Sequence, residues 1–170
     1  MCIRARHFVA RGIEVDIDKL PLDEAASYEM LTRGETVGVF QLESSGMRDL
    51  VRQARPTNIE DIIALVALYR PGPMENIPKY CEVKNGISAR DTLHPSIDHI
   101  LDETQGIIVY QEQVMQIAQE MAGYSLGGAD LLRRAMGKKI QEAMDAERPK
   151  FLKGSAEHGV DEDTAIEVWN

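Results

Sequence analysis

Positive charge is concentrated in one short stretch of this acidic chain, ADLLRRAMGKK at residues 129–139. Arg133, Arg134, Lys138 and Lys139 lie there, although the whole chain carries a formal net charge of −9. On a helix, Arg134 and Lys138 are four residues apart and share a face, whereas Arg133 projects about 100° away. Guanidinium groups bind phosphate oxygens in a bidentate manner, so a triphosphate or a nucleic-acid backbone is the natural partner.

Two readings of this stretch remain open from the spacing alone. Gly127 and Gly128 precede it and let a backbone approach a ligand closely, and a helix N-terminus there adds positive potential. Asp130, however, stands four residues before Arg134, and such a pair is typical of an ordinary solvated helix face. Spacing by itself favours the solvated face.

Two further segments carry polar residues that could support a nucleotide site. Arg70 lies in YRPGP, where a rigid Pro-Gly-Pro turn could hold it toward a phosphate, although a cation at a helix C-terminus also stabilises the helix dipole. Gln41 and Ser44 lie in FQLESSGM, a candidate ligand loop. The glutamines of the later stretch YQEQVMQIAQE are expected to be solvated rather than functional.

Signals for catalysis or metal binding are weak. Asp16 and Asp18 alternate with apolar residues, and such a carboxylate pair can hold magnesium for phosphoryl transfer. Acidic surface loops are common, however, and no third carboxylate accompanies the pair. Cys2 and Cys81 lack metal-binding spacing and fit a reducing cytosol. No Walker loop, G-x-S-x-G or GxGxxG motif occurs, so we expect neither a catalytic residue nor a metal ligand here.

Composition indicates a globular chain with a core of its own. Of its 170 residues, 44 % are hydrophobic, 28 % are charged and only 5 % are aromatic. No run approaches the roughly 18 apolar residues that span a bilayer, so no membrane segment is expected. The acidic balance argues against a general polyanion binder but permits a local basic patch.

Helical periodicity dominates the sequence. Asp23 is a candidate cap or first-turn acid for the first helix, and Thr57 with Glu60 forms a capping-box pattern before the apolar run that ends at Pro71. A helix bent or interrupted at Pro149 and a final helix with no stop signal complete the pattern. Helices are expected over residues 22–34, 46–54, 57–70, 110–123, 125–137, 138–159 and 161–170.

The remaining segments are expected to be non-helical. VGVFQLES, residues 37–44, predicts a strand or a buried extended segment because its valines and phenylalanine favour β structure. GIIVY, residues 106–110, predicts a second short extended segment. Residues 74–98 are punctuated by Pro, Gly and Asn and are expected to form a connector, with a turn at Asn85-Gly86.

Two long blocks of the sequence resemble a known family. They are GVFQLESSGMRDLVRQARPTNIEDIIALVALYRPGPMENIPKY and LDETQGIIVYQEQVMQIAQEMAGYSLGGADLLRRAMGKK. Together they resemble the C family of replicative DNA polymerases, the alpha subunits of bacterial DNA polymerase III, and the resemblance runs from about Gly12 to the last residue. It implies a mainly α fold, the helical fingers domain, with a few short extended segments. Residues 1–20 are then a connector from the palm side, and residues 21–170 are a fingers domain truncated at its C-terminus.

The resemblance also assigns roles to the residues above. It implies that Arg133, Arg134, Lys138 and Lys139 bind the incoming deoxynucleoside triphosphate. Supporting nucleotide-binding roles fall to Arg70, Gln41 and Ser44.

The partners implied are template-primer DNA and the other domains and subunits of a cytoplasmic polymerase holoenzyme. Mg²⁺ belongs to the parent enzyme, whose catalytic aspartates are in palm motifs that this sequence lacks. We therefore expect the chain to be a piece of a longer protein and to have no polymerase activity alone. Two alternatives remain: a stand-alone, non-catalytic helical module that binds nucleotide, DNA or protein, and a metal-dependent phosphotransferase that uses Asp16 and Asp18.

Overall fold

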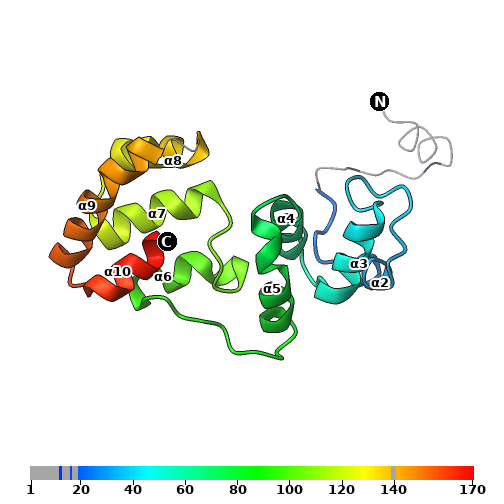
Figure 1. Ribbon diagram of the computed structural model, residues 1–170. Helices are drawn as coiled ribbons and strands as arrows, with labels where there is room; N and C mark the ends of the chain where they lie inside the picture. The colour runs from blue at the N-terminus through cyan, green and yellow to red at the C-terminus, as the bar shows by residue number, and fades with distance from the viewer. Residues whose placement is uncertain (1–11, 13–15, 17–18, 139–140) are drawn as a thin grey trace.

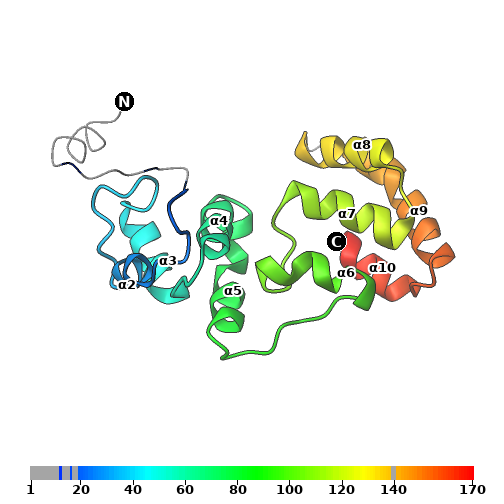
Figure 2. The ribbon, with the colours of Figure 1, turned by 180° about the vertical axis from the view of Figure 1, so that it is seen from behind.

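The structure is a computed structural model that describes residues 12, 16, 19–138 and 141–170. Within these residues all regular secondary structure is helical, which confirms the predicted mainly α class. Figure 1 shows two groups of helices side by side, α2 to α5 in one and α6 to α10 in the other, and Figure 2 shows them from behind. The elements are α2 (Ala25–Thr32), α3 (Ser45–Ala54), α4 (Ile59–Leu68), η2 (Pro73–Asn76), α5 (Ile77–Lys84), α6 (Pro95–Asp98), η3 (His99–Thr104), α7 (Gln111–Ala122), α8 (Leu126–Gly137), α9 (Gln141–Glu157) and α10 (Glu162–Trp169).

In the first lobe, α2 to α5, the helices α2, α3 and α4 begin with polar side-chain caps. Glu24, rather than the expected Asp23, caps α2 by accepting a hydrogen bond from the backbone N–H of Ser27 at 2.7 Å. Asn58 caps α4 by accepting from the backbone N–H of Asp61 at 2.8 Å, so the capping-box prediction from Thr57 was wrong. Each cap satisfies an N–H that has no partner inside its helix.

A buried ion pair joins α4 to α5 in this lobe. Asp61 is only 3 % exposed, and its carboxylate lies 2.8 Å from Nζ of Lys84. The same carboxylate accepts hydrogen bonds from the backbone N–H of Thr57 at 2.8 Å and from the hydroxyl of Tyr80 at 3.2 Å. Around this group the lobe buries an apolar core that includes Leu31, Leu50, Val51, Leu65, Leu68 and Cys81.

Two further expectations, for residues 37–44 and 74–98, were wrong. Residues 37–44 form turns rather than a strand, and Val37 and Phe40 are 84 % and 83 % exposed instead of buried. Gly38 and Gln41 adopt positive φ angles of 77° and 65°, which an extended strand does not permit. The expected connector at 74–98 instead contains η2, α5 and α6, because Tyr80 and Cys81 of α5 pack into the core.

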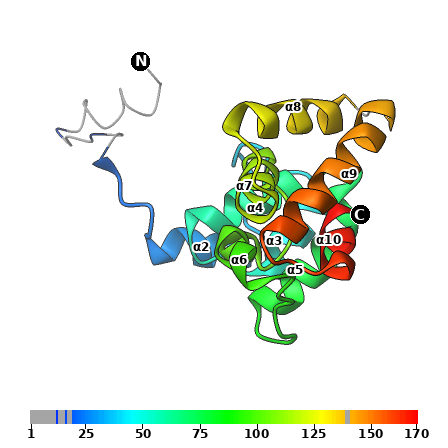
Figure 3. The ribbon, with the colours of Figure 1, turned by 90° about the vertical axis from the view of Figure 1, so that its left-hand side faces the viewer.

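The second lobe, α6 to α10, is built around α7. This helix packs against both α8 and α9, and α10 packs on α9. Figure 3 shows α8 lying along the outside of this group. Gly154 allows the close approach of α9 to α7, because a Cβ there would lie 3.0 Å from the carbonyl carbon of Ala122 and closer still to its oxygen. The helix α9 runs through Pro149 without interruption, contrary to one of the alternatives expected.

A buried glutamine connects the two lobes. Gln113 of α7 is 4 % exposed, and its Oε1 accepts hydrogen bonds from the backbone N–H groups of Val109 and Tyr110 at 2.8 and 2.9 Å. Its Nε2 donates to the carbonyl of Ile100 and to Thr104 Oγ1, at 3.1 and 2.8 Å. Val109 in turn packs in the core of the first lobe. The expectation that Gln113 is solvated was therefore wrong. Its hydrogen bonds fix the start of α7 both to the segment that precedes the helix and to η3.

Candidate functional site

The helix α8 carries the predicted phosphate-binding residues. It begins after Ser125, whose hydroxyl accepts from the backbone N–H of Gly128 at 3.2 Å, and it ends at Gly137 as expected. Ala129, Leu132 and Ala135 are buried against the second-lobe core, so the positions between them are turned outward. The apolar periodicity of α8 thus determines which cations reach the surface.

One carboxylate holds both arginines. Asp130 Oδ1 accepts hydrogen bonds from Nε and Nη2 of Arg133 at 3.0 and 2.8 Å. Its Oδ2 lies 2.8 Å from Nη2 of Arg134. These contacts lower the pKa of Asp130, and the hydrogen bond from Arg133 has the largest effect. The carboxyl group of Asp130 is therefore ionised at neutral pH.

The remaining members of the cluster differ in what the structure shows. Nη1 of Arg133 donates to Oε1 of Gln111, the first residue of α7, at 2.8 Å. Lys138 is the exposed C-cap of α8 and keeps helical backbone angles, so it stays on the face of Arg134. Lys139 lies outside the described residues. The contact to Gln111 spans 22 residues, and no local sequence signal indicates it.

The other predicted site residues lie in the first lobe. Ser44 caps α3 and accepts from the backbone N–H of Met47 at 3.2 Å, while Gln41 and Arg70 are exposed. Their segments touch, because a Cβ on Gly46 would lie 2.9 Å from Cζ of Tyr69. The N-terminal turn of α3 therefore lies against the residue that precedes Arg70.

The predicted site residues thus form two groups. Figure 1 and Figure 2 both show α3 at the far end of the first lobe from α8. The structure brings Arg133, Arg134 and Lys138 together on α8, and it brings the segments of Ser44 and Arg70 together in the first lobe. It does not join the two groups into one cavity among the residues described.

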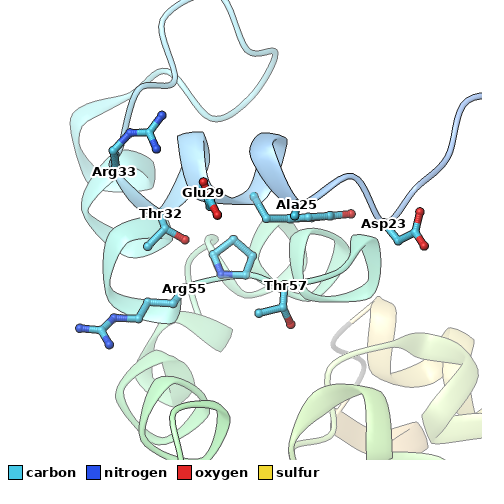
Figure 4. A pocket seen from close by; sticks show the side chains of 9 residues that line it. Asp23, Ala25, Glu29, Thr32, Arg33, Arg55 and Thr57 are labelled. Carbon is cyan, nitrogen blue, oxygen red and sulfur yellow. The ribbon is translucent and has the colours of Figure 1, made fainter.

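A hollow of about 490 Å³ lies away from both groups, against α2. Figure 4 shows Thr32 and Thr57 at its wall, with the guanidinium group of Arg55 pointing away. Arg33, at its edge, is held by two hydrogen bonds to Glu35 of 3.0 Å each. We assign no ligand to this hollow.

The structure also bears on metal and thiol chemistry. Among the described residues, no group of three His, Cys, Asp or Glu side chains is arranged to hold a metal ion. Asp16 forms an ion pair with Lys19 at 2.9 Å, and Asp18 lies outside the described part of the chain. Burial raises the pKa of the Cys81 thiol to about 11, so it stays protonated at neutral pH and is a poor nucleophile.

The sequence matches a family of polymerase domains over most of its length. Residues 3–159 match the family described as the bacterial DNA polymerase III alpha subunit finger domain, and the chain belongs to this family. The helical fold of the described residues agrees with that assignment. In the part of the chain that the structure describes, no helix has the length and apolarity needed to cross a bilayer.

Individual relatives carry the name of one protein. The chain is 58 % identical over 164 residues to the DNA polymerase III subunit alpha of Caulobacter vibrioides, covering 96 % of this chain. It is 56 % identical over 166 residues to that of Thermus aquaticus, covering 95 %, and 53 % identical over 163 residues to that of Pasteurella multocida, covering 92 %. The matched region is 14 % of the length of each relative.

Proposed function

We propose that this chain forms the fingers of a DNA-directed DNA polymerase and that α8 contacts the phosphates of the incoming deoxynucleoside triphosphate. The observation that carries the proposal is the exposed pair Arg134 and Lys138 on one face of α8. Asp130 compensates only part of the positive charge there, since it is shared between two arginines. The positive charge that Asp130 leaves uncompensated, on Arg134 and Lys138, is available to bind a polyanion.

The chemistry of phosphoryl transfer explains why such cations help. Negative charge redistributes over the phosphate oxygens as the bond to the leaving pyrophosphate breaks, and fixed positive groups stabilise that redistribution. Arg134 would donate bidentate hydrogen bonds to phosphate oxygens through its planar guanidinium group. Lys138, one helical turn later, would contact the phosphates through an ammonium group on a flexible side chain. Mg²⁺ would supply the electrophilic assistance in the whole enzyme, and we propose that its ligands lie outside this chain.

The first-lobe residues have a supporting role in this proposal. Arg70, Gln41 and Ser44 are all exposed, and the segment that contains Ser44 lies against the segment that contains Arg70. From there they can contact template-primer DNA or the nucleotide. The whole enzyme would work in the cytoplasm with the other domains and subunits of the holoenzyme. The chain alone would not extend a primer.

Photolabelling tests the proposed function. A deoxynucleoside triphosphate with a photoreactive group on its γ-phosphate is bound to the whole polymerase with template-primer and then irradiated. We expect the label in peptides from residues 126–141, because α8 faces the phosphates. Labelling that leaves these peptides unmodified while other parts of the polymerase react would contradict the proposal. An irrelevant chain of the same net charge is the control for non-specific labelling.

A further inference from the structure

Each of the three guanidinium nitrogens of Arg133 donates a hydrogen bond within the chain. Its Nε and Nη2 both donate to Asp130, and its Nη1 donates to Gln111. The side chain is only 29 % exposed. A phosphate that bound the Nε and Nη2 edge of Arg133 in a bidentate manner would have to displace Asp130, which would then lose charge-assisted hydrogen bonds.

Arg134 is in a different situation on the same helix. Its side chain is 61 % exposed, and its ion pair to Asp130 uses Nη2. Lys138 lies four residues later on the same exposed face. Among the described cations of the cluster, Arg134 and Lys138 are thus the more accessible to solvent or to a ligand.

The hydrogen bonds that hold Arg133 are connected to the buried core through Gln111. Gln111 is the first residue of α7 and lies two residues before the buried Gln113. The Gln113 side-chain amide makes the four hydrogen bonds, described above, that hold the start of α7 between the two lobes. From there the contacts run through Arg133 to Asp130 and on to Arg134. Each side chain in this series limits the rotamers of the next, so a fixed helix start is linked to an exposed guanidinium.

We propose that Arg133 is a positioning residue, held by Gln111 and Asp130, and that it orients Arg134 through the Asp130 carboxylate that both arginines contact. Arg134 and Lys138 make the phosphate contacts. This inference rests on the proposed function of α8. It assigns different roles to two adjacent arginines, because Arg133 is hydrogen-bonded to Gln111 of α7 whereas the side chain of Arg134 is exposed to solvent. It also makes Asp130 a structural anion that holds the two guanidinium groups in place before the nucleotide arrives.

A mutant cycle in the whole polymerase tests this division of roles. Arg133→Ala is expected to lower kcat/KM for the deoxynucleotide by about tenfold, the effect of misplacing a group that binds the transition state. In the Arg134→Ala/Lys138→Ala background, the same change should cost less than about twofold, because there is nothing left to position. Template-primer affinity, measured separately, should not change.

Gln111→Ala provides a second, milder variant, since it removes one exposed side chain and leaves the α7 capping network intact. It should lower kcat/KM by about threefold in the wild type and have no further effect in Arg133→Ala. Gln116→Ala, an exposed glutamine on the same helix, is the matched control and should behave as wild type.

The outcomes separate the two proposals. If Arg133→Ala or Gln111→Ala costs as much without Arg134 and Lys138 as with them, Arg133 contacts the substrate itself and the positioning role is wrong, while the function of α8 stands. If removal of Arg134 and Lys138 leaves kcat/KM unchanged, the proposed function of α8 fails and the positioning role fails with it.

Discussion

Replacing Arg134 and Lys138 together by alanine in the whole polymerase should lower kcat/KM for the incoming deoxynucleotide by about 100-fold. A hydrogen bond to a charged group contributes about 1.5–3 kcal/mol, and each 1.4 kcal/mol is tenfold, so two such contacts account for this factor. Steady-state primer extension with a single nucleotide varied measures it. The effect should appear for all four bases alike, because phosphates carry no base identity.

Charge loss alone must be separated from loss of these two contacts. Arg148→Ala/Lys153→Ala removes the same two positive charges from exposed positions on α9. This control should change kcat/KM by no more than about twofold, because exposed charges away from a ligand are screened by salt. Equal losses in the two double variants would show that the effect is a general field effect and would contradict a specific role for α8.

Asp61→Ala should destabilise the first lobe by about 3–5 kcal/mol, because it leaves Lys84 without its buried counter-charge. The change also removes the acceptor for the backbone N–H of Thr57 and for the hydroxyl of Tyr80. The free energy of unfolding, from urea titration followed by circular dichroism, measures the loss. Asp61 therefore fixes α4 against α5.

The neighbouring carboxylate supplies the control for Asp61. Glu60→Ala, an exposed change in the same first turn of α4, should cost about 1 kcal/mol or less through the helix dipole. Asp61→Asn, which keeps the shape and part of the hydrogen bonding, should fall between the two. A loss below about 1 kcal/mol for Asp61→Ala would mean that the ion pair with Lys84 is not a net constraint on the lobe.

The helices that could be predicted are those whose signals are local. Apolar spacing and a glycine stop gave α7, where Gly123 ends the helix with a φ of 66°, and the same logic gave α8. Proline in the first turn and a short length concealed α5, whose place in the fold depends on Tyr80 and Cys81 reaching the first-lobe core. Contacts across the fold decide such an element, and local periodicity does not record them.

The candidate site shows the same division. Spacing predicted the pair of Asp130 with Arg134, because residues four apart on a helix are neighbours. It did not predict the contact of Arg133 with Gln111, which depends on how α8 packs on α7. Nor did polarity predict that Gln113 is buried, since an amide can be buried when all its hydrogen bonds are made inside the protein.

The most direct test of the central claim is a structure of the whole polymerase with template-primer and an incoming deoxynucleotide. We predict that Arg134 and Lys138 lie about 2.7–3.2 Å from phosphate oxygens, while Arg133 keeps its contacts to Asp130 and Gln111. Phosphates bound instead by groups from elsewhere in the polymerase, with Arg134 and Lys138 turned to solvent, would contradict the claim that α8 is the phosphate-binding helix.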